Sequence, residues 1–192
     1  MRIADCQRVN CLHNGTATGA MYDIQRIGEL AKKYGLLYFV DTVFSLGGAN
    51  VETDKWGIDF NVGLALVSVS EKGWQKMMNR KTPAVTFSFD LLRWKKRWLP
   101  KERGGTLEQV WRRQPVAMPV YLVYALAEAT MLILEEGVEN VFTRHRIIAE
   151  SVRAALKQMG LGLFCEKSVL SNTLTAFMFL QELMIGLSGE RW

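Results

Sequence analysis

One carboxylate stands at the end of an apolar run that has the composition of a buried strand. Residues 36–40 read LLYFV, and Asp41 follows them directly. A second polar group, HNGTATG at 13–19, follows another short strand-like run, residues 7–12. Carboxylate, imidazole and hydroxyl groups bind charged ligands and move protons, yet the same side chains also satisfy ordinary loop amides. From position alone, Asp41 is best explained as such a turn residue, and Thr16 as a loop residue.

The segment between these two groups has the pattern of an amphipathic helix. Its apolar side chains recur at helical spacing from Ile24 to Tyr34, and Gly35 is a stop signal. Strand, helix and strand then form a βαβ unit, which implies a parallel sheet covered by helices. Because ligands bind at the carboxyl ends of the strands in such sheets, HNGTATG and Asp41 are expected to face one pocket.

Two further strand-like runs, FNV at 60–62 and LALVSVS at 64–70, are separated by Gly63 alone. Ser70 is placed to cap a helix over about 71–80. A second amphipathic stretch covers about 87–98 and leads into a basic loop that contains glycine.

The last third of the chain is predicted to be mainly helical. Pro115 and Pro119 introduce a long apolar helix that reaches Glu136, and Gly137 separates it from a second long helix ending at Gly160. The segments LGLFC and TLTAFMFL that follow have the composition of two strands.

Composition excludes several classes of protein. The apolar fraction of 49% and the charged fraction of 22% are those of a globular protein. The first residues lack an apolar signal-peptide core, and the longest uncharged stretches, 114–127 and 168–181, are too short to span a bilayer. Three cysteines without a C-x-x-C pair and only two histidines argue against a disulfide framework or a metal site. We therefore expect a cytoplasmic protein without membrane contact.

The net charge of +5 comes from one segment. Residues 93–113 carry eight Lys or Arg against two Glu, a local +6, and Trp94, Trp98 and Trp111 interleave with them. Such a pattern is also found in platforms for single-stranded nucleic acid. A solvated face or a subunit contact is the commoner explanation, and no nucleic-acid partner is expected.

Residues 13–48, HNGTATGAMYDIQRIGELAKKYGLLYFVDTVFSLGG, resemble the class V pyridoxal-phosphate-dependent aminotransferases, and within them the alanine–glyoxylate and serine–pyruvate branch. The similarity continues through WGIDF, LALVSVSEKGWQKM and YALAEATMLILEEGVENVFTRHR, and covers most of 9–175. It implies an α/β fold: an incomplete fold type I large domain, aspartate aminotransferase-like, with the start of a small α+β domain. The implied boundaries are 1–114 for the large domain, 115–160 for connecting helices and 161–192 for the small domain.

The resemblance also implies roles for individual residues. Asp41 would pair with the pyridine nitrogen of pyridoxal 5'-phosphate, which keeps the ring an electron acceptor. Thr16 falls at the family's cofactor-contacting hydroxyl, and Val43 at the apolar side chain on the ring face. His13 aligns with a family histidine before the loop, where we favour a loop-orienting hydrogen bond.

The family's Schiff-base lysine has no counterpart here, so the catalytic residue is unknown. That lysine lies in a Gly-Ser-x-Lys loop between the two strands after WGID, whereas this chain has only Gly63 there. Adjacent strands need a connection of at least about two residues. Either 59–70 is therefore one long strand, or about a dozen residues are missing between Val62 and Leu64. Lys72 opens the next helix and is expected to be solvated.

Other departures concern the cofactor phosphate and the substrate. The family's glycine-rich phosphate loop would lie upstream of this chain, and its carboxylate-binding arginine downstream. Gln114 and Ala117 stand where the family offers tyrosine and a hydroxyl to the partner subunit's phosphate, and they cannot do the same work, although Arg112 or Arg113 can supply charge there.

The resemblance implies a homodimeric enzyme that transfers an amino group from a small amino acid, of alanine or serine type, to glyoxylate or pyruvate. The missing lysine loop is either a true deletion or an omitted segment. Two alternatives remain open: an inactive remnant that binds a partner through the dimer surface, and a basic nucleic-acid binder using 93–113.

Overall fold

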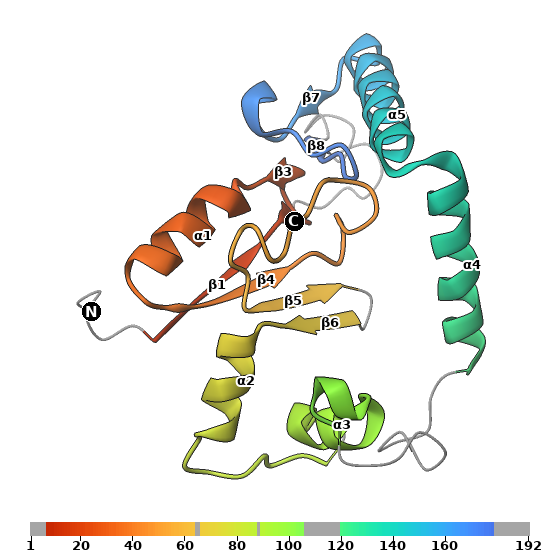
Figure 1. Cartoon of the computed structure of the whole chain (residues 1–192). Helices are drawn as coiled ribbons and strands as arrows, with labels where there is room; N and C mark the ends of the chain where they lie inside the picture. Colours follow the sequence, from red (N-terminus) through yellow and green to blue (C-terminus); the bar gives the residue numbers. More distant parts are fainter. Residues whose placement is uncertain (1–6, 64–65, 88, 106–119, 179–192) are drawn as a thin grey trace, which may run out of the picture. The chain divides into compact units, whose positions relative to one another are not determined.

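A four-stranded sheet organises the part of the chain that carries Asp41. The structure, a computed structural model, describes residues 7–63, 66–87, 89–105 and 120–178. The sheet has the order β1-β4-β5-β6 (Figure 1). Its strands are β1 (Arg8–Leu12), β4 (Leu37–Asp41), β5 (Phe60–Gly63) and β6 (Leu66–Val69). The first three are parallel, and β6 is antiparallel to β5, so the predicted parallel α/β sheet is confirmed.

The predicted βαβ unit is present as β1, helix α1 (Ile24–Lys33) and β4. Asp23 caps α1 by accepting a hydrogen bond from the Arg26 amide at 2.9 Å. The helix buries one apolar face against the sheet, because β-strand side chains alternate between faces and the even positions of β4 point to it. The buried cluster consists of Ile24, Ala31, Leu36, Tyr38, Val40 and Ile58.

Two backbone features set the position of α1. Gly35 ends the helix region with a φ of 66°, a left-handed conformation that glycine adopts without strain. Gly28 allows close packing, since a Cβ there would lie 2.1 Å from the Trp56 carbonyl oxygen. The Tyr38 hydroxyl then donates to the Ile24 carbonyl at 2.8 Å, which ties the core of the sheet to the helix.

The structure rejects one of the two alternatives for 59–70, a single long strand. β5 and β6 form an antiparallel hairpin in which Phe60 faces Val69 and Gly63 faces Leu66. The chain therefore reverses after Gly63 rather than at it, and only residues 64–65, which lie outside the described residues, connect the strands. The sequence pattern left the single strand open because the apolar run LALVSVS gives no sign of where the second strand begins, which the backbone pairing with β5 sets at Leu66.

A second small hairpin lies inside the segment predicted to be a loop. β2 (Asn14–Gly15) and β3 (Ala20–Met21) pair antiparallel around the turn 16–19. The Gly15 carbonyl accepts from the amides of Thr18 at 3.1 Å and Gly19 at 2.8 Å, and Gly19 has a φ of 70°. The glycines of HNGTATG thus form a tight turn rather than an open loop.

Residues 70–132 form a separate compact unit from 1–69 with 133–192. It contains α2 (Glu71–Met78), capped by the Ser70 hydroxyl as predicted, and α3 (Leu91–Trp98). α3 begins later than predicted because Asp90 is its N-cap. A short 3-10 turn, Lys101–Arg103, follows. The implied domain boundaries at 114 and 160 remain predictions.

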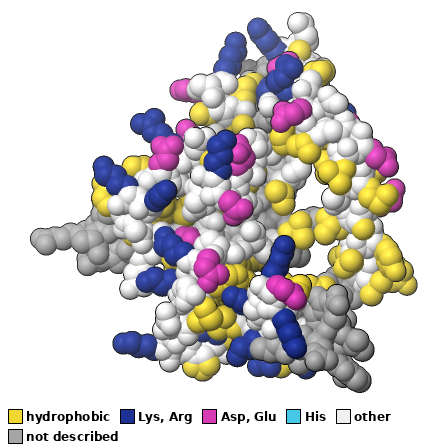
Figure 2. Space-filling model, viewed as in Figure 1, with side chains coloured by type: hydrophobic (Ala, Val, Ile, Leu, Met, Phe, Trp, Pro, Cys, Tyr) yellow, Lys and Arg dark blue, Asp and Glu magenta, His cyan; other side chains and the backbone are white. Residues whose placement is uncertain are grey.

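Some basic side chains of this unit lie against aromatic rings. The Lys95 ammonium is 4.7 Å from the ring centre of Trp74, and the Arg93 guanidinium is 4.1 Å from that of Phe87. Arg80 also pairs with Asp90 at 3.6 Å. Figure 2 shows Lys and Arg side chains gathered over α2 and α3. Residues 106–113 of the basic segment lie outside the described residues.

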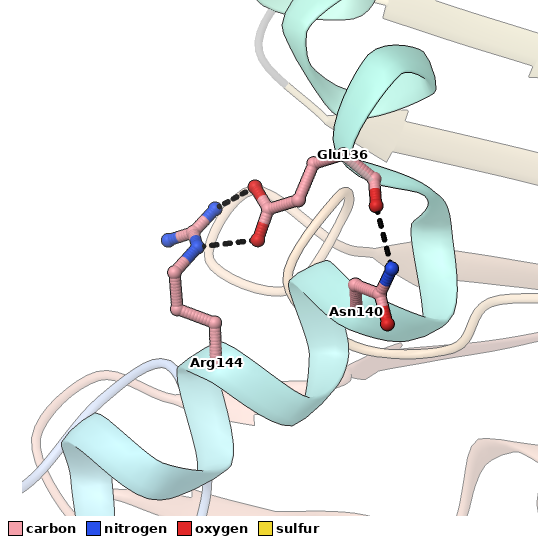
Figure 3. A network of polar contacts seen from close by, with 3 residues as sticks. All are labelled: Glu136, Asn140 and Arg144. Atoms are coloured by element: carbon pink, nitrogen blue, oxygen red, sulfur yellow. Dashed lines mark hydrogen bonds and ion pairs between the residues drawn. The ribbon is translucent and has the colours of Figure 1, made fainter.

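Helices α4 (Val120–Glu136) and α5 (Val138–Gln158) confirm the predicted helical stretch and its break at Gly137. Gly137 has a φ of 86°. Asn140 donates to the Glu136 carbonyl at 2.7 Å, and Arg144 makes a two-pronged ion pair with the Glu136 carboxylate at 2.7 and 2.8 Å (Figure 3). This pair is exposed, so the glycine and the amide cap contribute more to the corner than the charges do.

Exposed apolar side chains follow α4, where Figure 2 shows them along the helix. Tyr121, Leu122, Tyr124 and Leu134 are each more than 60% exposed. Among the helices that the structure describes, no apolar stretch reaches the length needed to cross a membrane.

The two predicted C-terminal strands are present but short. β7 (Gly162–Leu163) pairs antiparallel with β8 (Phe177–Met178), and a 3-10 turn, Lys167–Val169, lies between them. Residues 171–176 are irregular and run beside the β2–β3 hairpin, where the Ser171 amide donates to the Gly19 carbonyl at 2.9 Å.

Candidate cofactor-binding site

The carboxyl ends of the parallel strands meet around Asp41. In the register of β1 and β4, Leu12 lies opposite Asp41, and Val62 of β5 lies on its other side. The next amides continue the ladder: His13 donates to the Asp41 carbonyl at 2.8 Å, and Thr42 donates to the Val62 carbonyl at 2.7 Å. Asp41 therefore occupies the centre of this edge, where parallel α/β sheets bind ligands.

The Asp41 side chain is exposed and has a fixed direction. Its Oδ1 accepts a hydrogen bond from the Val43 amide at 2.9 Å, an Asx-type turn. This bond explains why an aspartate ends a buried strand, and it leaves Oδ2 available to a ligand.

A shallow apolar cavity of about 340 Å³ adjoins the carboxylate. Its lining residues are Asn10, Cys11, Leu12, Phe39, Val40, Asp41 and Val62. Phe39 stacks on Phe60 with ring centres 4.2 Å apart, which adds a flat apolar surface on the same side of the sheet. This volume and lining suit a planar heterocycle, with one carboxylate to orient it.

Val43, predicted to pack on the ring face, follows Asp41 by two residues and is 45% exposed. An apolar side chain left in water beside a fixed carboxylate is available to cover a ligand. Thr16, predicted to contact the cofactor, lies in the turn of the β2–β3 hairpin and is exposed. Within the described part of the chain, its hydroxyl has no hydrogen-bond partner. Both roles remain predictions.

The His13 side chain is buried next to the turn after β4 and is not exposed at the carboxyl edge of the sheet. It is only 5% exposed, and Nδ1 forms a 2.8 Å hydrogen bond with the Ser45 hydroxyl. Burial lowers the pKa of His13 below that of free histidine, because desolvation disfavours the charged ring. The imidazole is therefore neutral near pH 7 and links the end of β1 to the turn after β4.

Sequence reasoning missed the buried polar residues that support this turn. The Thr42 hydroxyl donates to Asn61 Oδ1 at 2.8 Å, and Asn61 Nδ2 donates to the Thr53 hydroxyl at 3.1 Å. Thr42 is fully buried. The available signal was that Asn61 lies within an apolar strand and Thr42 directly follows one. Polar residues at such positions usually belong to a hydrogen-bonded network.

The residues present fit the ring of pyridoxal phosphate but not its covalent attachment. A fixed carboxylate, an exposed apolar side chain and a shallow apolar cavity suit the pyridine ring. No lysine occurs in 60–69, and the hairpin leaves only residues 64–65 between its strands. Lys72 is exposed in α2, which belongs to the other compact unit. Among the described residues, no group of three or more His, Cys, Asp or Glu side chains forms a possible metal site.

The fold is that of the pyridoxal-phosphate-dependent transferases of fold type I. The chain superimposes on an alanine–glyoxylate aminotransferase from Nostoc sp. with a TM-score of 0.80 and 30% identity, over 91% of this chain and 47% of that one. Residues 3–64 match the family described as Aminotransferase class-V. An uncharacterized aminotransferase from Methanocaldococcus jannaschii is 40% identical over 90% of this chain and 45% of its own length.

The family match over residues 3–64 and these relatives agree with the class-V aminotransferase family that the sequence resemblance implied. An alanine–glyoxylate aminotransferase from Rattus norvegicus is 31% identical over 79% of this chain and 38% of its own length. The chain thus spans about half the length, or less, of the curated relatives it matches.

Proposed function

We propose that this protein is a pyridoxal-phosphate-dependent aminotransferase that moves an amino group from a small amino acid, of alanine or serine type, to glyoxylate or pyruvate. The observation that carries the proposal is the Asp41 carboxylate, fixed by the Val43 amide at the centre of the carboxyl edge of a parallel sheet, next to a shallow apolar cavity. Relatives named for alanine and glyoxylate support this substrate class.

The chain's own residues have distinct tasks in this proposal. When bound, the cofactor supplies an electron sink for the bond broken at the substrate's α-carbon. Asp41 would hold a proton at the ring nitrogen, because a carboxylate next to that nitrogen favours the charged pyridinium. Val43 covers one face of the ring and excludes water from it. Thr16 donates a hydrogen bond to the cofactor from the hairpin turn, and His13 orients the turn behind Asp41.

We further propose a cytoplasmic homodimer with no nucleic-acid or membrane partner. The exposed apolar side chains of α4 support self-association, since such a surface needs a cover in water. Gln114 and Ala117, which stand where the family contacts the partner's phosphate, lie outside the described residues.

One observation favours a second candidate, an inactive remnant that keeps the ring site. The β5–β6 hairpin closes without a lysine, and a covalently attached cofactor needs one. In this case the chain binds the cofactor reversibly and acts through its interaction surface.

A single assay separates the two candidates. Purified chain is incubated with pyridoxal phosphate, glyoxylate and alanine labelled at the amino nitrogen, and glycine is measured by mass spectrometry. Labelled glycine formed over many turnovers supports the aminotransferase. Cofactor binding without glycine supports the remnant, and absence of both overturns both.

The matched binding control compares Asp41→Asn with Asp54→Asn. Asp54 is an exposed carboxylate outside this cavity. Equal loss of binding in both variants would contradict the assignment of Asp41.

A further inference from the structure

The turn after Asp41 is held by a side chain from the far end of the chain. The Phe44 carbonyl accepts hydrogen bonds from Asn14 Nδ2, at 3.0 Å, and from the Thr173 hydroxyl. Asn14 Nδ2 also donates to the Thr173 hydroxyl oxygen at 2.6 Å. Asn14, Phe44 and Thr173 thus form a closed triangle, which we call the Phe44 clasp.

Several contacts show that this approach is close. A Cβ on Gly48 would lie 2.5 Å from Thr173 Cγ2, so the turn passes Thr173 with no room for a side chain. Ser171 helps to hold Thr173 in place, because the Thr173 amide donates a hydrogen bond to Ser171 Oγ at 3.2 Å. The Ser171 amide in turn bonds the Gly19 carbonyl of the hairpin. The segment 170–176 is therefore anchored on both loops of the site.

Asn14 is committed to the clasp. It is 4% exposed, and Nδ2 donates both hydrogen bonds that its side chain makes with described residues, to Phe44 and Thr173. Its Oδ1 is buried without a hydrogen-bond partner. Rotating the amide by half a turn would place an oxygen against the Phe44 carbonyl, so the observed orientation is the one that the clasp requires.

The Phe44 clasp holds the backbone next to the amide that orients the Asp41 carboxylate. The Val43 amide, which fixes the Asp41 carboxylate, lies one residue before Phe44. On the other side of Phe44, Ser45 is held by His13, and its amide donates to the Thr42 carbonyl at 2.9 Å. Among the described residues, the other hydrogen bonds of residues 42–46 are made with residues 13–62.

We propose that Thr173 and Asn14 are positioning residues for the Asp41 carboxylate and the Val43 side chain. Through the Phe44 carbonyl, the segment after α5 sets the geometry of a ring site built by β1 and β4. What the site binds rests on the proposed function, whereas the clasp itself does not.

The test compares three variants of the chain. Thr173→Val removes the hydroxyl at nearly constant shape, and Thr173→Ser keeps it. Thr175→Val is the matched control, because the Thr175 hydroxyl has no hydrogen-bond partner among the described residues. Two quantities are measured: amide hydrogen exchange at Ser45, Leu46 and Gly48, and the Kd for pyridoxine, a ring probe without an aldehyde.

We expect Thr173→Val to speed exchange at these turn amides about five- to tenfold, because a lost hydrogen bond of ordinary strength changes an opening equilibrium by about that factor. The Kd for pyridoxine should rise by a similar factor. Exchange at Leu36 and Tyr38 in the βαβ core should stay unchanged. Thr173→Ser and Thr175→Val should behave like the parent chain.

Unchanged exchange at the turn in Thr173→Val would overturn the proposal. If exchange rises throughout the chain, Thr173→Ser decides: restored turn protection supports a role for the hydroxyl, and continued loss overturns it. If the parent chain binds no pyridoxine while the turn still loosens, the clasp stands and the proposed function fails. Pyridoxine binding that is equally tight in Thr173→Val, with a loosened turn, overturns the positioning role.

Discussion

The β1–β4 edge of the candidate site has the residues needed to orient a ring, whereas the β5–β6 hairpin lacks the lysine needed to attach it. At the β1–β4 edge, Asp41, the Val43 amide and the His13–Ser45 pair form a fixed group supported by a buried core. At the β5–β6 end, where the family carries its lysine, the strands pair up to Gly63 and Leu66 and no lysine is available. The fold that orients a ring is thus retained independently of the group that would attach it.

The reason for this independence is structural. The β1–α1–β4 unit has its own apolar core and its own helix caps, so it does not depend on the length of the next connection. The β5–β6 hairpin needs only complementary backbone hydrogen bonds and a short turn. The length of this hairpin can therefore vary without disturbing the β1–α1–β4 frame.

Replacing one side chain in each region tests whether the β1–α1–β4 core contributes more to the free energy of unfolding than the β5–β6 hairpin does. Tyr38 is fully buried at the centre of the βαβ core, whereas Val67 of β6 is 44% exposed. Tyr38→Ala should lower the free energy of unfolding by about 3–5 kcal/mol, and Val67→Ala by less than about 1 kcal/mol. Urea unfolding followed by circular dichroism measures both. Equal losses would mean that the hairpin is as much a part of the core as the βαβ unit.

The second prediction concerns ligand binding at Asp41. Asp41→Asn should raise the Kd for pyridoxine about tenfold or more, because an amide cannot stabilise the pyridinium charge. Since the carboxylate is exposed, the free energy of unfolding should change by less than about 1 kcal/mol. Fluorescence titration gives the Kd. Tight binding by the Asn variant would remove Asp41 from the site.

The third prediction concerns His13, which is buried next to the Asp41 end of the sheet, and the pH dependence of stability. The folded-state pKa of His13 is lowered by burial, so the unfolded chain binds a proton more readily. Stability is therefore complete above the unfolded pKa of about 6.5 and falls as the pH drops toward the folded value. His13→Gln should reduce the loss of stability between pH 8 and pH 5, seen as a smaller shift in Tm. The same pH dependence in both proteins would show that other groups cause it.

Local patterns in the sequence predicted the frame well. The spacing from Ile24 to Tyr34, the cap at Ser70 and the break at Gly137 each correspond to an observed boundary. These features depend on neighbouring residues, so one short stretch contains the whole signal. The resemblance likewise predicted the family and the fold.

Contacts between distant segments could not be predicted in this way. Asn14 and Thr173 meet across 159 residues, and neither has a neighbour that indicates the other. The β5–β6 turn was missed because backbone pairing, not glycine content, decided where the chain reverses. Thr16, Val43, His13 and Asp41 are placed near this edge or behind it, but their roles toward a cofactor remain predictions.

Both candidate functions require a site for the cofactor ring at Asp41, in a chain that has no lysine in 60–69 to attach it. The direct measurement adds pyridoxal phosphate to the parent chain and to Asp41→Asn, followed by borohydride reduction and peptide mass spectrometry. We predict reversible binding that depends on Asp41, with no single lysine modified in proportion to the bound cofactor. One lysine reduced stoichiometrically with a stable imine band, in the parent chain but not in Asp41→Asn, would contradict this prediction and identify the missing attachment site.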